Sequence, residues 1–340
     1  MKQIVIKGAF FLLSLILGLV ILIVAFSPSL PTRADDIIQD ILNSKSPELV
    51  VGDTGKVKSG DYEIWYESIK PLGEVKGTVL LIMGLGGDAL EWPAFFYEPL
   101  VDHGYHVIRY DNRSTGNSEK VRDWSADHPY TLEDMSLDAL SVLDEVGAEN
   151  AHIIGISMGG MIGQSMAIHT PHRVQTLTSI MSSADINDPE LPQVNRKLFL
   201  RLIAASLRYG IGGSEVGVMR QRIAARSVFV PYLSEDRMAV LAEKALYSKR
   251  NRDTPYRGAF RQHIAAINAS GSRVSALKGV KVPSLVIHGE DDPLIPIEHG
   301  KKTANLIPAA LGVWVPQMGH DFAPEHMGVI HEAIFNLLDG

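Results

Sequence analysis

The fold is decided by one stretch in the middle of the chain, residues 151–160, which reads AHIIGISMGG. Its first six residues form a short apolar run that predicts a buried strand. The run leads into a Gly-x-Ser-x-Gly sequence between Gly155 and Gly159, which we expect at a sharp turn from the strand into a helix. Small residues let the backbone turn tightly enough to lift the Ser157 hydroxyl above the sheet. Ser157 is therefore the candidate nucleophile.

A candidate base follows late in the chain. A serine hydroxyl is a poor nucleophile unless a base takes its proton and an acid orients that base. Acidic residues follow the predicted strand 282–288, and His320 follows the predicted strand 312–315 and precedes the last predicted helix. The order Ser, Asp, His is the one that accompanies the Gly-x-Ser-x-Gly turn. We predict that His320 is the catalytic base.

Strands and helices alternate around this stretch, which predicts an α/β fold. Besides 151–156, the expected strands are 62–67, 78–83, 106–110, 174–180, 282–288 and 312–315, with helices at 131–146 and 326–338. Such alternation predicts a mostly parallel sheet with helices on both faces and a site at the carboxyl ends of the strands. Residues 185–273 interrupt this alternation, because their pattern predicts several helices and no convincing strand. We interpret them as an inserted helical cap.

These patterns predict five segments along the 340 residues, a length that suits one α/β core with an insertion. They are an N-terminal membrane anchor or signal segment (1–27), a linker (28–57), the first part of the core (58–184), the helical cap (185–275) and the second part of the core (276–340).

The N-terminus carries an apolar run, residues 8–26, of 19 residues without a charge. That length predicts a transmembrane helix that acts as a signal anchor. Lys2 and Lys7 precede it, which predicts a cytoplasmic N-terminus and a catalytic body anchored on the extracytoplasmic side, periplasmic or extracellular. Pro28 directly follows the best cleavage site, which argues against cleavage. Cleavage of the segment would instead give a secreted protein.

Composition excludes several classes of protein. A net charge of −7 gives no general attraction to nucleic acid. The chain has no cysteine, so disulfides, thiolate metal sites and cysteine nucleophiles are impossible. No spacing of histidines indicates a metal site. We expect neither a metal nor a cofactor.

Two further motifs accompany the Gly-x-Ser-x-Gly turn. Residues 110–118 read YDNRSTGNS, and Met83-Gly84 ends the predicted strand 78–83. With these motifs, the chain from about Tyr62 to its C-terminus resembles the α/β-hydrolase superfamily, in the serine-esterase branch similar to aclacinomycin methylesterase. The resemblance implies an α/β-hydrolase fold.

The resemblance also implies the remaining site residues. In such proteins the acid ends a His-Gly-x-x-Asp sequence, which here gives Asp292, with Asp291 and Asp185 as alternatives. The oxyanion donors are the backbone N–H groups of Met158, after the nucleophile, and Leu85, in the loop after the third strand. Many relatives have His-Gly where this chain has Met83-Gly84, but a backbone donor does not need that histidine.

Three other residues allow two interpretations each. Asp111 and Arg113 could bind substrate charges, but we favour an ion-paired, hydrogen-bonded turn. Trp92 follows the loop that carries Leu85 and could either line the pocket or pack in the core. The sequence leaves these two possibilities for Trp92 open.

The function predicted from these residues is hydrolysis of a carboxylic ester. Ser157 argues against the haloalkane dehalogenase and epoxide hydrolase branches, which resemble this chain overall but use an Asp at this position. We expect a small-molecule ester substrate, with lipid-like esters at the membrane as one class, and an acyl-enzyme intermediate. The alternatives are a cofactor-free haloperoxidase or C–C bond hydrolase with the same triad, and a non-catalytic binding protein. The oligomeric state is not indicated.

The predicted cap is basic, whereas the whole chain is acidic. Residues 185–273 hold 15 Lys and Arg against 8 Asp and Glu, a charge of +7. Two interpretations follow: attraction to anionic lipid headgroups or an acidic substrate, or arginines on solvated helix faces. We favour the second.

Overall fold

The structure is a computed structural model that describes residues 18, 23, 25–45, 48–193, 195–210, 213–252, 256 and 258–340. It divides into two compact units. The larger unit holds the described residues of 47–194 and 247–340, and the smaller unit holds those of 1–46 and 195–246.

Eight strands of the described residues form one sheet in the larger unit, in the order β1-β2-β4-β3-β5-β6-β7-β8. The strands are β1 (Asp53–Ser59), β2 (Tyr62–Ile69), β3 (Gly77–Ile82), β4 (Tyr105–Tyr110), β5 (Ala151–Ile156), β6 (Val174–Ile180), β7 (Ser284–Gly289) and β8 (Leu311–Val315). β2 runs antiparallel to both β1 and β4, and every other neighbouring pair is parallel. The predicted mostly parallel α/β sheet is confirmed.

β1 is the strand that hydropathy did not indicate. It reads DTGKVKS, lies at the edge of the sheet, and leaves most of its side chains exposed or half-buried. A polar edge strand lacks the continuous apolar run of a buried parallel strand. For this reason its first residues fell within the predicted linker 28–57.

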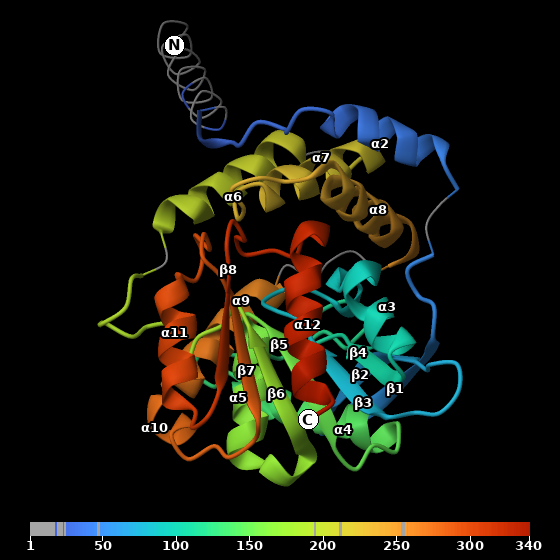
Figure 1. Cartoon of the computed structure of the whole chain (residues 1–340). Helices are drawn as coiled ribbons and strands as arrows, with labels where there is room; N and C mark the ends of the chain where they lie inside the picture. Colours follow the sequence, from blue (N-terminus) through green and yellow to red (C-terminus); the bar gives the residue numbers. More distant parts are fainter. Residues whose placement is uncertain are drawn as a thin grey trace, which may run out of the picture. The chain divides into compact units, whose positions relative to one another are not determined.

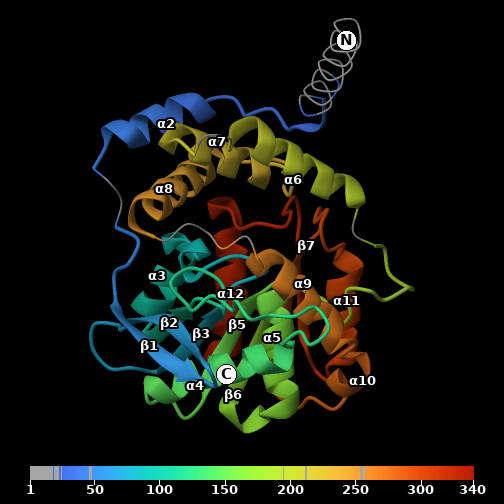
Figure 2. The same cartoon turned by 180° about the vertical axis from the view of Figure 1, so that it is seen from behind.

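Alternate residues of the central strands face two separate hydrophobic cores, since successive side chains of a strand point to opposite faces. In β3, Leu80 and Ile82 join the core that includes α4 and α5, while Val79 and Leu81 join the core that includes α3 and α12. Figure 1 shows α3 and α12 on the near face, and Figure 2 shows α4 and α5 from behind. The prediction of helices on both faces is confirmed.

The α-helices that the structure describes belong to one unit or the other, with α8 spanning the boundary between their residue ranges. In the larger unit they are α3 (Ala94–Asp102), α4 (Leu132–Glu145), α5 (Met158–His169), α9 (Gly258–Ser270), α10 (Val274–Leu277), α11 (Ile297–Leu306) and α12 (Met327–Leu338). The others are α2 (Ala34–Asn43), α6 (Arg196–Tyr209), α7 (Glu215–Arg226) and α8 (Glu235–Asn251).

The smaller unit has its own hydrophobic core. Ile38 and Ile41 of α2 are buried together with Met219 and Ile223 of α7. α2 begins with an acidic first turn, and its apolar residues share one face.

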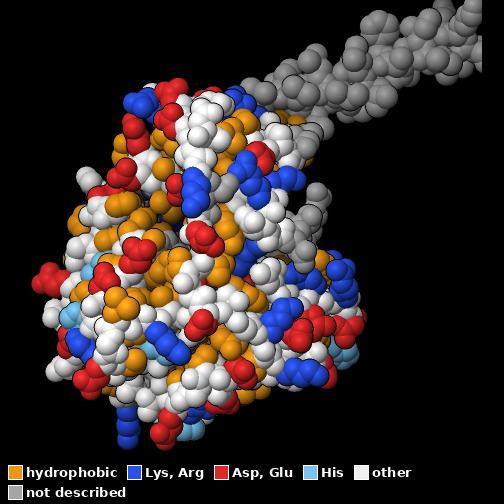
Figure 3. Space-filling model, turned by 90° about the vertical axis from the view of Figure 1, so that its right-hand side faces the viewer, with side chains coloured by type: hydrophobic (Ala, Val, Ile, Leu, Met, Phe, Trp, Pro, Cys, Tyr) orange, Lys and Arg blue, Asp and Glu red, His pale blue; other side chains and the backbone are white. Residues whose placement is uncertain are grey.

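On the molecular face of Figure 3, basic and acidic side chains of the described residues are interspersed.

The predicted N-terminal transmembrane helix is the part of the fold class that the structure contradicts. Among the described residues, no helix is both long and apolar enough to span a bilayer. A span needs about 20 consecutive apolar residues, whereas the amphipathic α2 has 10 residues. The predicted span itself, residues 8–26, lies outside the described residues except for Gly18, Ile23, Ala25 and Phe26.

A buried ion pair ties β2 to β4. Glu67 and Arg109 lie directly opposite each other in the antiparallel register, and Arg109 Nε donates to Glu67 Oε2 at 2.7 Å. The other carboxylate oxygen, Oε1, accepts the N–H groups of Val51 and Gly52 at 2.6 and 2.7 Å. The pair therefore also fixes the segment that leads into β1.

We predict that Arg109→Met destabilises the protein by about 3–5 kcal/mol, because it leaves the Glu67 carboxylate buried without its counter-charge. Urea unfolding followed by circular dichroism measures the change.

The matched control is Lys56→Met on β1. Lys56 Nζ lies 3.5 Å from Glu63, and both side chains are about half exposed. A surface pair of this kind contributes about 0–1 kcal/mol. Equal losses for the two variants would contradict a special role for the buried pair.

Candidate active site

Ser157 stands at the turn between β5 and α5 in a backbone conformation that few non-glycine residues adopt. Its φ is 56° and its ψ is −121°. Such a conformation costs on the order of 1–3 kcal/mol and persists only where neighbours enforce it. The Ser157 N–H donates to the Ile180 carbonyl at 2.8 Å, and its carbonyl accepts the Ser182 hydroxyl at 2.7 Å. These bonds to the end of β6 hold the turn.

The glycines of the turn are required by close backbone packing. A Cβ on Gly155 would collide with the Gly159 carbonyl, and one on Gly159 would collide with the Ile82 carbonyl at the end of β3. A Cβ on Gly84, in the loop after β3, would lie 3.1 Å from the Ser157 Cβ. The oxyanion loop, residues 83–89, therefore passes directly beside the candidate nucleophile.

The candidate base and acid lie together in the loops after β8 and β7. His320 Nδ1 is 2.6 Å from Asp292 Oδ2, and both side chains are buried. The other carboxylate oxygen, Oδ1, accepts the N–H groups of Leu294 and Ile295 at 2.8 and 2.9 Å. The carboxylate therefore has a fixed orientation toward the imidazole.

Charge and hydrogen bonding keep Asp292 ionised. Burial opposes ionisation, but His320 and His288 outweigh it and hold the pKa of Asp292 well below its ordinary value. His288 Nε2 lies 3.5 Å from the same Oδ2 atom. An ionised acceptor at this place favours the Nδ1–H tautomer of His320, in which Nε2 carries no proton, as the candidate base requires.

The two alternative acids occupy different surroundings. The Asp291 side chain is exposed, although its N–H donates to the Met318 carbonyl. Asp185 Oδ1 accepts the N–H of Asn187 at 2.9 Å within its own loop. Of the three candidates, Asp292 is thus the one whose carboxylate lies against His320.

The two predicted oxyanion donors come from the start of α5 and from the oxyanion loop. Met158 is the first residue of α5, where the helix supplies no acceptor for its backbone N–H. The helix dipole adds a partial positive charge at the same end. Leu85 follows Gly84, the residue that approaches the Ser157 side chain. Both positions suit backbone donors to a developing oxyanion.

The turn after β4 supports the oxyanion loop at both ends. Asn112 Nδ2 donates to the Met83 carbonyl at 3.0 Å, and the Ala89 N–H donates to Asp111 Oδ1 at 2.8 Å. Arg252 neutralises Asp111, with Nη1 3.0 Å from Oδ2. Asp111 therefore acts as a buried structural anchor.

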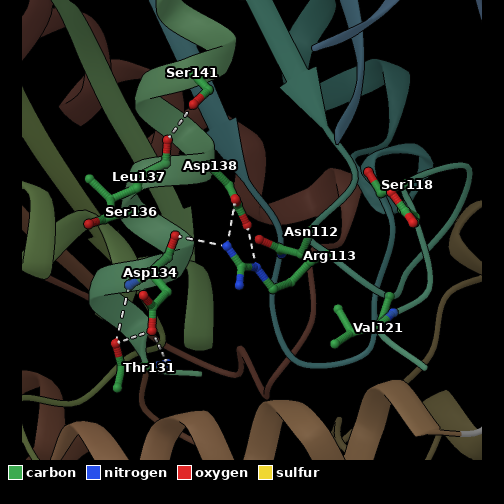
Figure 4. Close-up of polar contacts among 12 residues, drawn as sticks. Asn112, Arg113, Ser118, Val121, Thr131, Asp134, Ser136, Leu137, Asp138 and Ser141 are labelled. Atoms are coloured by element: carbon green, nitrogen blue, oxygen red, sulfur yellow. Dashed lines mark hydrogen bonds and ion pairs between the residues drawn. The ribbon is translucent and has the colours of Figure 1, made fainter. Parts of the chain in front are cut away.

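Arg113 is also structural. Its Nε and Nη2 donate to the two carboxylate oxygens of Asp138 on α4, each at 2.7 Å, and Nη2 also donates to the Asp134 carbonyl (Figure 4). The interpretation of Asp111 and Arg113 as an ion-paired turn is confirmed.

Trp92 is buried against Phe96 and Phe322, with ring centroids 4.7 and 5.4 Å away, so it packs in the core.

Two residues of the site had no clear signal in the sequence. Asn112 lies inside the recognised turn motif, but only its contact with Met83 shows that it holds the oxyanion loop. His263 of α9 accepts the Gly86 N–H at 3.1 Å, across 177 residues of sequence.

No group of three or more His, Asp or Glu side chains within the described residues could hold a metal ion.

Comparisons with known proteins agree with this geometry. A family model described as alpha/beta hydrolase fold matches residues 77–326. Rhodomycin D methylesterase DauP of Streptomyces sp. (strain C5) is 30% identical over 291 residues, which cover 78% of this chain and 92% of the relative. Rhodomycin D methylesterase DnrP of Streptomyces peucetius is 29% identical with the same coverage.

A solved structure shows the same fold. The enol-lactonase from Burkholderia xenovorans LB400 aligns with a TM-score of 0.65 at 22% identity, covering 84% of this chain and all of that chain. Together with the curated relatives, this likeness confirms the predicted resemblance to esterase-type α/β-hydrolases.

We predict that Gly159→Ala abolishes most of the activity, because the new Cβ must displace either the Ser157 turn or the end of β3. A displacement of about 1 Å costs on the order of 100-fold in rate, and overpacking costs about 1–3 kcal/mol of stability. Ester hydrolysis and thermal unfolding measure the two effects.

Gly328→Ala on α12 is the matched control, since a Cβ there meets no atom within 4 Å. The control should keep full activity. An active Gly159→Ala variant would show that the close packing is not needed for the site.

Proposed function

We propose that this chain, a member of the α/β-hydrolase family, cleaves carboxylic esters of small molecules through an acyl-enzyme on Ser157. The relatives named above support an esterase-type hydrolase. The observation that carries the proposal is the buried contact of 2.6 Å between His320 and Asp292, in loops that follow the carboxyl ends of neighbouring strands β8 and β7. The strained Ser157 turn lies at the carboxyl end of β5 in the same sheet.

In the first half of the proposed cycle, the Ser157 Oγ attacks the ester carbonyl while His320 Nε2 takes its proton. The carbonyl oxygen becomes an oxyanion, which the N–H groups of Met158 and Leu85 stabilise. The intermediate then collapses, the C–O bond to the alcohol breaks, and the imidazolium returns its proton to the leaving alkoxide. Asp292 stabilises the imidazolium and keeps its orientation.

In the second half, water attacks the acyl-enzyme. His320 takes a proton from the water, a second oxyanion forms in the same place, and Ser157 leaves with the proton returned by His320. The products are a carboxylic acid and free enzyme. Besides the ester and water, the proposed cycle uses the side chains of Ser157, His320 and Asp292 and the two backbone N–H groups.

The names of the relatives suggest which class of ester to test first. The names of both curated relatives describe methylesterases, so we extend methyl esters to this chain as the first class to test. Nitrophenyl esters of increasing acyl length then compare short-chain substrates with lipid-like ones. The preferred chain length reports the size of the acyl pocket.

We predict that a fluorophosphonate probe labels the purified wild-type chain and that Ser157→Ala abolishes labelling. Asp292→Asn should lower kcat by about 100- to 10,000-fold, because the amide cannot stabilise the imidazolium or hold the same tautomer. Steady-state kinetics with the best ester measures the loss.

Asp291→Asn is the matched control, because it makes the same change one residue away on an exposed side chain. An exposed substitution of this kind should change stability by no more than about 0.5 kcal/mol and leave kcat unchanged. Full hydrolysis by Ser157→Ala would contradict the proposed mechanism, and a greater loss for Asp291→Asn would assign the acid to Asp291.

A further inference from the structure

A buried histidine of α9, His263, contacts the oxyanion loop. His263 is fully buried, and its Nδ1 accepts the backbone N–H of Gly86 at 3.1 Å. Its Nε2 lies 3.0 Å from the carbonyl oxygen of Arg113, in the turn after β4. The imidazole therefore bridges the oxyanion loop and the turn after β4, both of which are far from His263 in sequence.

The two partners fix the tautomer of His263. An N–H group needs an acceptor, so Nδ1 carries no proton, and a carbonyl needs a donor, so Nε2 carries one. Burial lowers the pKa of His263 to about 4. The imidazole thus stays neutral at physiological pH, and its acceptor remains available to Gly86.

Gly86 lies at the bend of the oxyanion loop. Its φ of 70° favours glycine, and the Gly87 N–H closes a tight turn onto the Gly84 carbonyl at 3.2 Å. The Gly86 N–H belongs to the peptide group that directly follows Leu85. Holding that N–H against His263 therefore limits rotation of the chain at Leu85.

We propose that His263 is a positioning residue for ester hydrolysis, which aligns the Leu85 N–H with the oxyanion by holding the neighbouring Gly86 amide. This inference rests on the proposed function. With the Asn112 bond to Met83 and the Asp111 bond to Ala89, it gives the oxyanion loop an anchor at positions 83, 86 and 89. A donor that is already oriented costs no reorganisation when charge develops.

α9 has other contacts within the larger unit, so its packing does not depend on His263 alone. Gln262 accepts the Ser114 hydroxyl and donates to the Val121 carbonyl, both at 2.7 Å. The Leu132 N–H donates to Ser270 Oγ at 2.8 Å. Conservative variants of His263 are therefore expected to fold.

Two amide variants separate the two bonds of the imidazole. In His263→Asn, the side-chain oxygen can occupy the place of Nδ1 and still accept the Gly86 N–H. In His263→Gln, the longer side chain can donate to the Arg113 carbonyl in place of Nε2 but leaves Gly86 without its acceptor. Each variant loses one hydrogen bond, so a purely structural role predicts similar melting temperatures and similar kcat values.

We expect His263→Gln to lower kcat by about 10- to 100-fold, within the range for a misplaced oxyanion donor. KM should change little, because the loop acts on the transition state more than on the bound ester. His263→Asn should keep most of the wild-type kcat. Equal kcat values for the two variants would overturn the inference.

Hydrogen–deuterium exchange gives a readout that needs no activity. Gly86 is exposed, so slow exchange of its amide in the full-length wild type would report the bond to His263. We expect protection in the wild type and in His263→Asn, and faster exchange in His263→Gln. Fast exchange in the wild type would overturn the inference even if a variant failed to fold.

His152→Asn is the matched control, since it changes another buried histidine, whose Nδ1 lies 2.9 Å from Thr176 Oγ1 at the start of β5 and β6. It should leave kcat and Gly86 exchange unchanged. A wild type that neither hydrolyses esters nor reacts with the fluorophosphonate probe would overturn the proposed function together with this inference. An active wild type with equal His263 variants would overturn this inference alone.

Discussion

The backbone conformation of Ser157 is the constraint on which the rest of the site depends. With φ at 56° and ψ at −121°, the residue turns the chain from β5 into α5 within one step. This is possible only because Gly155 and Gly159 allow backbone to pack on backbone at the ends of β3 and β5. The same close packing brings Gly84 beside the Ser157 side chain. One steric arrangement therefore places the candidate nucleophile, the start of α5 and the oxyanion loop.

Buried hydrogen bonds and ion pairs then hold the oxyanion loop and His320, which this packing does not fix. The turn after β4 holds the two ends of the oxyanion loop through Asn112 and Asp111, and Asp292 holds His320. The carboxylates of Asp111 and Asp292 each accept backbone N–H groups and lie beside a basic side chain, so their burial does not leave an unpaired charge. The cost of removing one partner is high for the same reason.

The sequence predicted those features that depend on local pattern. Apolar runs such as 151–156 predicted the parallel strands, and the Gly-x-Ser-x-Gly spacing predicted the Ser157 turn. Family resemblance gave the choice of Asp292 over Asp291, which the contact with His320 supports. The polar edge strand β1 and the contact between His263 and Gly86 were not predictable, because neither leaves a hydrophobic period or a short motif. The transmembrane helix expected at residues 8–26 was inferred from hydropathy alone, and the described residues contain no such helix.

The acyl-enzyme on Ser157 is the central claim, and product partitioning tests it most directly. The wild-type chain is supplied with esters that share one acyl group but differ in leaving alcohol, in water containing a fixed concentration of methanol. A common acyl-enzyme predicts that the initial rates of methyl ester and free acid formation have the same ratio for every leaving group, because both products form after the alcohol has left. A ratio that changes with the leaving group would contradict a common acyl-enzyme and indicate direct attack of water on the bound ester.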